Sequence, residues 1–262
     1  MSTLRIVRLR RVAREILPLV LGCSLLPAVT YGQVDPPKPG TLADAMNEVK
    51  LGNVAYVDQI VRIAGAEHAV PLLEDLFAHN QDASEKDAFA KEWIAGELVR
   101  LGARDDVYWN FVVNEARKTL ESDAPDFMNL DPQSPSPAGP SPEFVAWAKA
   151  HNFSMESVSY EAVYPIKLGP LIRTGDARAI PLLRRGLLAP NHQVEAASAM
   201  GLVILKDRDS IPLIVQACKR APAAAAPAIA MSLLQFHDAE AQSAAEPYLT
   251  QDMMKALPES KK

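Results

Sequence analysis

The five histidines are the side chains of this sequence best suited to acid–base or metal chemistry. They are His68, His79, His151, His192 and His237. None pairs with another histidine, a cysteine or a carboxylate at the spacing of a metal-ligand motif, and neither H-E-x-x-H nor C-x-x-C occurs. The nucleophile motif G-x-S-x-G and glycine-rich phosphate loops are missing as well. The sequence therefore predicts no catalytic residue, no metal ligand and no cofactor, and we expect a protein that is not an enzyme.

The aromatic side chains could instead contact a partner. The densest cluster is the Tyr-Trp-Asn-Phe run at residues 108–111, which could stack against a sugar or a peptide. The alternative interpretation, which we favour, is that alternate members pack into the core of a helical protein while Tyr108 sits at the rim of that core. In the helix expected over residues 105–120, Val107, Phe111 and Val112 fall on one side.

A proline-rich segment spans residues 122–142 and has serines between its prolines. It cannot continue as regular helix or strand, and it is too long for an ordinary turn between helices. Two interpretations stay open: a segment that docks on a partner, or an inert spacer. A helix resumes at Pro142 and places Phe144 and Trp147 on one face. The candidate partner-binding residues of both regions are Tyr108, Trp109, Pro132, Pro135, Pro137 and Trp147.

The first 32 residues have the pattern of a signal peptide. Arginines are followed by an apolar run over residues 16–29, and Thr30-Tyr31-Gly32 resembles a cleavage site before Gln33. The run is shorter than the roughly 20 residues that a membrane-spanning helix needs. We therefore expect an exported protein, periplasmic or secreted, with no membrane span in the mature chain.

A second route of export is also open, because residues 20–23 (Val-Leu-Gly-Cys) approximate a lipoprotein signal. Cys23 would then carry a lipid at the mature N-terminus. With either route Cys218 is left without a cysteine partner for a disulfide, and its apolar helical context predicts burial.

The charge balance excludes two classes of partner. The formal net charge is −5, and residues 1–32 hold five arginines and one glutamate, so their removal leaves about −9. An acidic chain is unsuited to nucleic acid and to anionic membrane surfaces. We expect a protein or peptide partner, and no nucleic acid.

The remaining sequence predicts helices that fold back on one another in pairs. In the central pair, residues 176–206, Asp176 caps the first helix, Ala189-Pro190 ends it and Asn191 caps the second. The apolar stripe of the first helix is Ile180, Leu183, Leu187 and Leu188. The stripe of the second helix is Val194, Ala197, Gly201, Ile204 and Leu205. Further helices are expected over residues 42–51, 54–64 and 155–172, the last kinked by its prolines.

Parts of the central pair recur along the chain. The Ile-Pro-Leu opening returns at residues 211–213, with Pro181 and Pro212 separated by 31 residues. Ala-Val-Pro-Leu-Leu at residues 69–73 is an earlier copy, with its second helix expected over residues 89–101. Spacings of this size are typical of repeat proteins, in which each unit buries its apolar face against its neighbours.

The Ala-Ile-Pro-Leu-Leu opening at residues 179–183, followed by Val-Glu-Ala-Ala-Ser-Ala-Met-Gly at residues 194–201, resembles the HEAT-like repeats first grouped with phycobilisome lyases. The resemblance implies an all-α fold, a right-handed α-solenoid of antiparallel helix pairs that is interrupted by the proline-rich loop. Together with the predicted signal peptide, it indicates an exported bacterial member. Two features depart from the family pattern. Glu195 stands where the family often has arginine, and Pro222 and Pro227 fall in or before the second helix of the third unit.

The resemblance also bears on function. We expect a non-catalytic exported scaffold that binds a protein or peptide in the cell envelope, on the face lined by the second helices. The alternatives are a ligand- or cofactor-handling protein related to bilin lyases, which act inside the cell, and a lipid-anchored envelope assembly factor. The expected divisions are a signal peptide (1–32), a flexible leader (33–40), N-terminal helical repeats (41–121), a proline-rich loop or linker (122–142), C-terminal HEAT-like repeats (143–251) and a flexible tail (252–262).

Overall fold

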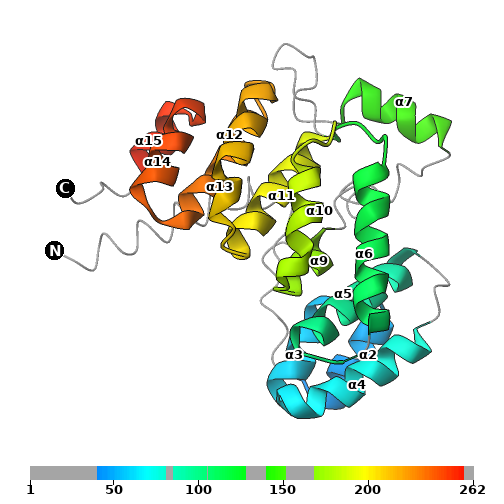
Figure 1. Ribbon diagram of the computed structural model, residues 1–262. Coiled ribbons are helices and arrows are strands. Elements are labelled where there is room, and N and C mark those ends of the chain that lie inside the picture. Colours follow the sequence, from blue (N-terminus) through cyan, green and yellow to red (C-terminus); the bar gives the residue numbers. More distant parts are fainter. Residues whose placement is uncertain (1–39, 81–84, 105, 128–139, 152–167, 257–262) are drawn as a thin grey trace. The chain divides into compact units, whose positions relative to one another are not determined.

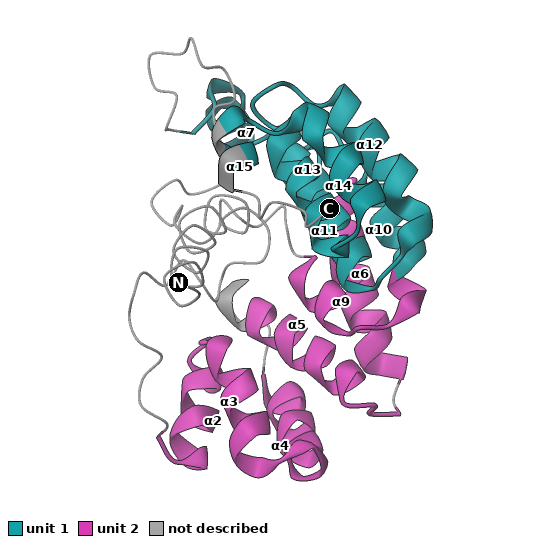
Figure 2. Ribbon diagram, turned by 90° about the vertical axis from the view of Figure 1, so that its left-hand side faces the viewer, with its two compact units in different colours: residues 1–24, 122–166, 180–262 teal, residues 25–121, 167–179 magenta. Residues whose placement is uncertain are grey.

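The computed structural model describes residues 40–80, 85–104, 106–127, 140–151 and 168–256. Within these ranges the secondary structure is helical, with no strand, and the helices pack against one another (Figure 1). The prediction of an all-α fold is confirmed. The chain divides into two compact units (Figure 2). The described residues of the N-terminal unit are 40–80, 85–104, 106–121 and 168–179, and those of the C-terminal unit are 122–127, 140–151 and 180–256.

Successive helices of the N-terminal unit pack as neighbours from α2 to α6, and α9 packs against α5 and α6. Their bounds are α2 (Leu42–Lys50), α3 (Ala55–Ala64), α4 (Ala66–His79), α5 (Glu85–Arg100), α6 (Asp106–Glu121) and α9 (Gly169–Arg173), followed by the 3₁₀ turn η3 (Ala177–Ala179). Local signals set the first boundaries. The Thr41 hydroxyl accepts from the backbone N–H of Asp44 while the Asp44 carboxylate accepts from that of Thr41, which makes a capping box.

A close backbone approach joins α5 to α9. A Cβ atom on Gly96 would lie 2.6 Å from the carbonyl oxygen of Pro170, closer than carbon and oxygen can approach without bonding. Gly96 is therefore a packing residue, because only a glycine lets the first turn of α9 rest on α5. The same contact buries Leu171 and Ile172, which are almost fully excluded from solvent.

The C-terminal unit is built mainly from α10 to α14, in which α11 packs on α10 and α13, and α13 on α12 and α14. Its elements are α7 (Pro142–Ala150), α10 (Ile180–Gly186), α11 (His192–Ile204), η4 (Arg208–Ser210), α12 (Ile211–Arg220), α13 (Ala226–Leu233), η5 (Leu234–Phe236), α14 (Ala239–Ala245), η6 (Glu246–Tyr248) and α15 (Gln251–Ala256). The predicted cap of α11 is confirmed, because the Asn191 side chain accepts from the N–H groups of Gln193 and Val194.

Three predicted core positions were wrong. Leu188 is 70% exposed, because α10 ends at Gly186 and the chain has already left the helical path. Ile204 is 47% exposed at the last position of α11, where the helix ends. Val107 is 55% exposed while its neighbour Tyr108 is buried, although Val112, which was predicted on the same side of α6, is buried as expected.

Several predictions fall on residues that the structure does not describe. The kinked helix expected over residues 155–172 is described only from residue 168, and α9 begins at Gly169 with Pro170 in its first turn. The signal peptide and most of the expected leader also lie outside the described residues. The described part of the chain has no helix with the length and hydropathy needed to cross a membrane.

Candidate binding pocket

Tyr108 and Trp109 point in different directions from α6. Tyr108 is buried, and its ring meets that of Phe77 edge-on with centroids 5.1 Å apart. Phe111, one turn later, contacts the same ring at 5.4 Å. Such edge-to-face contacts stabilise a core. The prediction that Tyr108 sits at the rim was therefore wrong: it is a packing residue, and Trp109 is the partly exposed member of the pair.

Trp109 is covered on one face by an arginine from a distant part of the sequence. The guanidinium carbon of Arg178 lies 4.2 Å from the centroid of the indole, a cation–π geometry. The sequence did not predict this contact, since 69 residues separate the two positions. The contact is set by the chain's return through α9 and η3, which belong to the same unit as α6.

Asp176 holds the arginine in this position. Its Oδ2 atom accepts from Nε and Nη2 of Arg178 at 2.8 and 2.7 Å, and its Oδ1 accepts from the Arg178 backbone N–H at 2.8 Å. These bonds lower the pKa of Asp176, with the side-chain hydrogen bond from Arg178 as the largest cause. They raise the pKa of Arg178, and the charge of Asp106 adds to this shift. Asp176 is thus both the predicted cap of the turn and an ion-pair partner.

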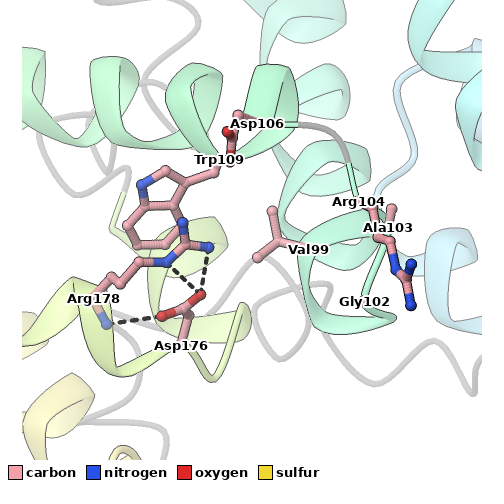
Figure 3. Close-up of a pocket in the computed structure, with 8 residues that line it drawn as sticks. All are labelled: Val99, Gly102, Ala103, Arg104, Asp106, Trp109, Asp176 and Arg178. Carbon is pink, nitrogen blue, oxygen red and sulfur yellow. Dashed lines mark hydrogen bonds and ion pairs between the residues drawn. The ribbon is translucent and has the colours of Figure 1, made fainter.

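The three side chains line a pocket of about 290 Å³ at the end of α5 (Figure 3). A second wall comes from the turn after α5, where Gly102 has a positive φ of 79° and Ala103 donates to the carbonyl of Leu98. Figure 3 shows Trp109, Arg178 and Asp176 together on one side, with Arg104 pointing away from them. The full lining is Val99, Gly102, Ala103, Arg104, Asp106, Trp109, Asp176 and Arg178.

The side chains that line this pocket can stack, form ion pairs and make hydrogen bonds. It combines an indole, an aliphatic side chain and paired charges of both signs, and its volume is at the lower end of the roughly 300–1,000 Å³ of small-molecule sites. It is therefore the size of one or two side chains. Among the described residues, no group of three histidine, cysteine or carboxylate side chains could hold a metal ion. The pocket offers anchoring by tryptophan and arginine, the residues most enriched at binding hot spots.

Trp147, the other predicted aromatic, belongs to the C-terminal unit. Its indole Nε1 donates to Asp123 Oδ1 at 2.8 Å, and its ring stacks on His151 with centroids 4.6 Å apart. Phe127 meets the buried ring of Phe144 edge-on at 5.2 Å. Trp147 thus ties α7 to the described start of the proline-rich segment.

Charged side chains connect two helices of the C-terminal unit. Arg220, at the C-terminal end of α12, donates to the buried carboxylate of Glu195 on α11 at 2.8 Å. Glu195 is thereby paired with a cation on α12. The predicted residues Cys23, Pro132, Pro135 and Pro137 lie outside the described residues. In comparisons with known proteins, no protein-family model, no curated protein and no solved structure matches this chain.

Proposed function

We propose that this chain is a non-catalytic, exported helical-repeat scaffold that binds a protein or peptide partner in the cell envelope. The partner contacts the N-terminal unit at the pocket around Trp109. The observation that carries the proposal is the stack of Arg178 on Trp109, held by Asp176 at the edge of an open pocket. A rigid indole and a fixed guanidinium bind with little loss of side-chain entropy on association.

The repeat character of the scaffold is supported by a regular series of aspartates. Asp176, Asp207 and Asp238 follow one another at intervals of 31 residues, and each precedes a helical segment. Within the C-terminal unit, Asp207 accepts from Arg184 and Asp238 accepts from Arg208. Each pair links one helix-turn segment to the next, as expected of stacked HEAT-like repeats. This regularity favours a solenoid, which presents an extended surface to a partner.

The size and charge of the pocket favour a peptide over a large cofactor. A volume of about 290 Å³ holds one or two side chains but not an extended tetrapyrrole of the kind that bilin lyases handle. The charges of Asp106, Asp176, Arg104 and Arg178 cancel, so hydrogen bonding and stacking decide affinity more than net charge does. This composition resembles the polar, aromatic surfaces of transient protein interfaces.

Site-specific photocrosslinking in cells tests the proposal. A photoreactive residue replaces Ala103, which lines the pocket, or Asn114, which is exposed on α6 outside the pocket. We expect one defined protein adduct from position 103 and none from position 114, and we expect Trp109→Ala to abolish it. Equal adducts from both positions, or an adduct that persists in Trp109→Ala, would show that the partner does not bind at this pocket.

Export is tested separately by mass spectrometry of the mature N-terminus. A chain beginning at Gln33 supports cleavage after Gly32 and excludes the lipid anchor. A diacylated chain beginning at Cys23 supports the lipid-anchored alternative. An uncleaved chain beginning at Met1 and recovered from the cytoplasm would refute export by either route.

A further inference from the structure

The described start of the proline-rich segment is fixed to the N-terminus of α11. The Asn191 side chain donates from Nδ2 to the carbonyl oxygens of Ala124 at 3.2 Å and Pro125 at 3.1 Å. Its Oδ1 meanwhile accepts from the first N–H groups of α11. One side chain therefore caps the helix and holds residues 124–125, and these bonds do not titrate near neutral pH.

Asp126 makes the second attachment, to His192. The backbone N–H of His192 donates to Asp126 Oδ1 at 2.7 Å, and the imidazole Nδ1 lies 2.6 Å from Oδ2. The side chains are 23% and 14% exposed, so water screens the pair only partly. Ser141 secures the other side, because its Oγ donates to the Asp126 carbonyl at 2.6 Å and its N–H to that of Phe127 at 2.7 Å.

The charges facing His192 come from three elements. Asp126 lies on the segment that enters the proline-rich region, Glu195 one turn along α11, and Arg220 at the end of α12. The hydrogen bond with Asp126 is the largest influence and raises the pKa of His192, against burial and the charge of Arg220, which lower it. Burial raises the pKa of Glu195 itself, against its hydrogen bond from Arg220.

We propose that the Asp126–His192 pair is a pH-sensitive clasp that holds residues 122–127 against the N-terminus of α11. With the imidazole protonated, Nδ1–H and the carboxylate form a charged hydrogen bond in a half-buried site. With the imidazole neutral, the Nδ1–H tautomer keeps the hydrogen bond but loses the charge. The clasp therefore loosens on deprotonation, while Asn191 keeps residues 124–125 nearby.

The direction of the pH dependence follows from linkage. A histidine whose folded pKa exceeds its value in the open state, near 6.5, contributes its full stabilisation below that value. The contribution is lost as the pH rises through the folded pKa. The opening equilibrium of the clasp is expected to rise about tenfold for each pKa unit between the closed and open states.

Nuclear magnetic resonance of the full chain tests the clasp with two readouts. The His192 imidazole of the wild type should titrate at higher pH than that of Asp126→Asn. Hydrogen exchange of the residue 192 amide, corrected for its intrinsic pH dependence, should accelerate above neutral pH in the wild type and should not do so in His192→Gln.

Asn191→Ser is the matched control, since it keeps a capping oxygen but loses both bonds to the carbonyls of residues 124 and 125. We expect faster exchange at every pH with the pH step retained. The proposal is overturned if exchange at residue 192 in the wild type is independent of pH. It is also overturned if Asp126→Asn leaves the His192 titration unchanged. This measurement can be made in any folded variant, even one in which the clasp is open.

Discussion

The guanidinium of Arg184, on α10, donates to the carboxylate of Asp207, in the turn before α12, through Nε at 2.9 Å and Nη2 at 2.8 Å. The Asp207 side chain is 8% exposed and also accepts from the Ser210 hydroxyl. This pairing raises the pKa of Arg184 through its hydrogen bond to Asp207. Two consecutive helix pairs are joined by a bond between a helix and a turn, which neither could form alone.

Removal of this link should destabilise the C-terminal unit. In Arg184→Gln the carboxylate of Asp207 loses its cation while staying largely buried, so the free energy of unfolding should fall by about 1–2 kcal/mol. Lys219 is exposed on α12, so Lys219→Gln serves as the control. It should change the free energy of unfolding by less than about 0.5 kcal/mol. Urea unfolding measures both, and equal stability of the two variants would contradict a structural role for Arg184.

The buried carboxylate of Glu97 gives a sharper contrast in the N-terminal unit. Glu97 is fully buried and accepts from Arg100 and Arg173, each through Nε at 2.8 Å, while Asp58, the other partner of Arg173, is 61% exposed. Burial lowers the pKa of Arg173. Glu97→Gln should therefore cost about 2–3 kcal/mol and Asp58→Asn less than about 1 kcal/mol. Thermal unfolding of both variants shows which substitution destabilises the protein more. A larger loss of stability in Asp58→Asn than in Glu97→Gln would refute the prediction.

Gly96 should not tolerate a methyl group. Alanine would gain roughly 1 kcal/mol of helix propensity, but its Cβ would overlap the Pro170 carbonyl oxygen, and overpacking of this kind costs about 1–3 kcal/mol. We expect Gly96→Ala to be less stable than the wild type. Gly169→Ala is the comparison, because its Cβ meets only the Trp93 ring, at 3.3 Å, and should cost less. A stabilised Gly96→Ala would mean that α9 does not rest on α5.

Cys218 should be chemically inert in the folded protein. Burial raises the pKa of its thiol to about 12, so the reactive thiolate is scarce at neutral pH. In a Cys23→Ser chain, labelling by a thiol reagent at pH 8 should be slow until the protein is unfolded. Stability should fall only as the pH rises above about 9, the unfolded value. Rapid labelling of the native chain would show that the thiol is accessible.

Local chemistry in the sequence determined the helices and several of their ends. Residues such as Asn191 at a cap and Pro142 in a first turn act on backbone groups only a few residues away, so their roles follow from neighbouring positions. The apolar period likewise predicted an all-α fold, because burial of one helical face needs only the right residue types at the right spacing. Asp176 was predicted as a cap because its carboxylate acts on a backbone N–H group only two residues away.

Contacts between distant residues were decided only by tertiary packing. Whether Val107 or Tyr108 enters the core depends on how the first turn of α6 packs against its neighbours. Periodicity placed Val112 correctly in the core, but it also placed Val107 there, which is 55% exposed. The sequence likewise could not pair Trp109 with Arg178. A cation–π contact has no signature along the chain, and its geometry exists only after α9 has returned to α5 and α6.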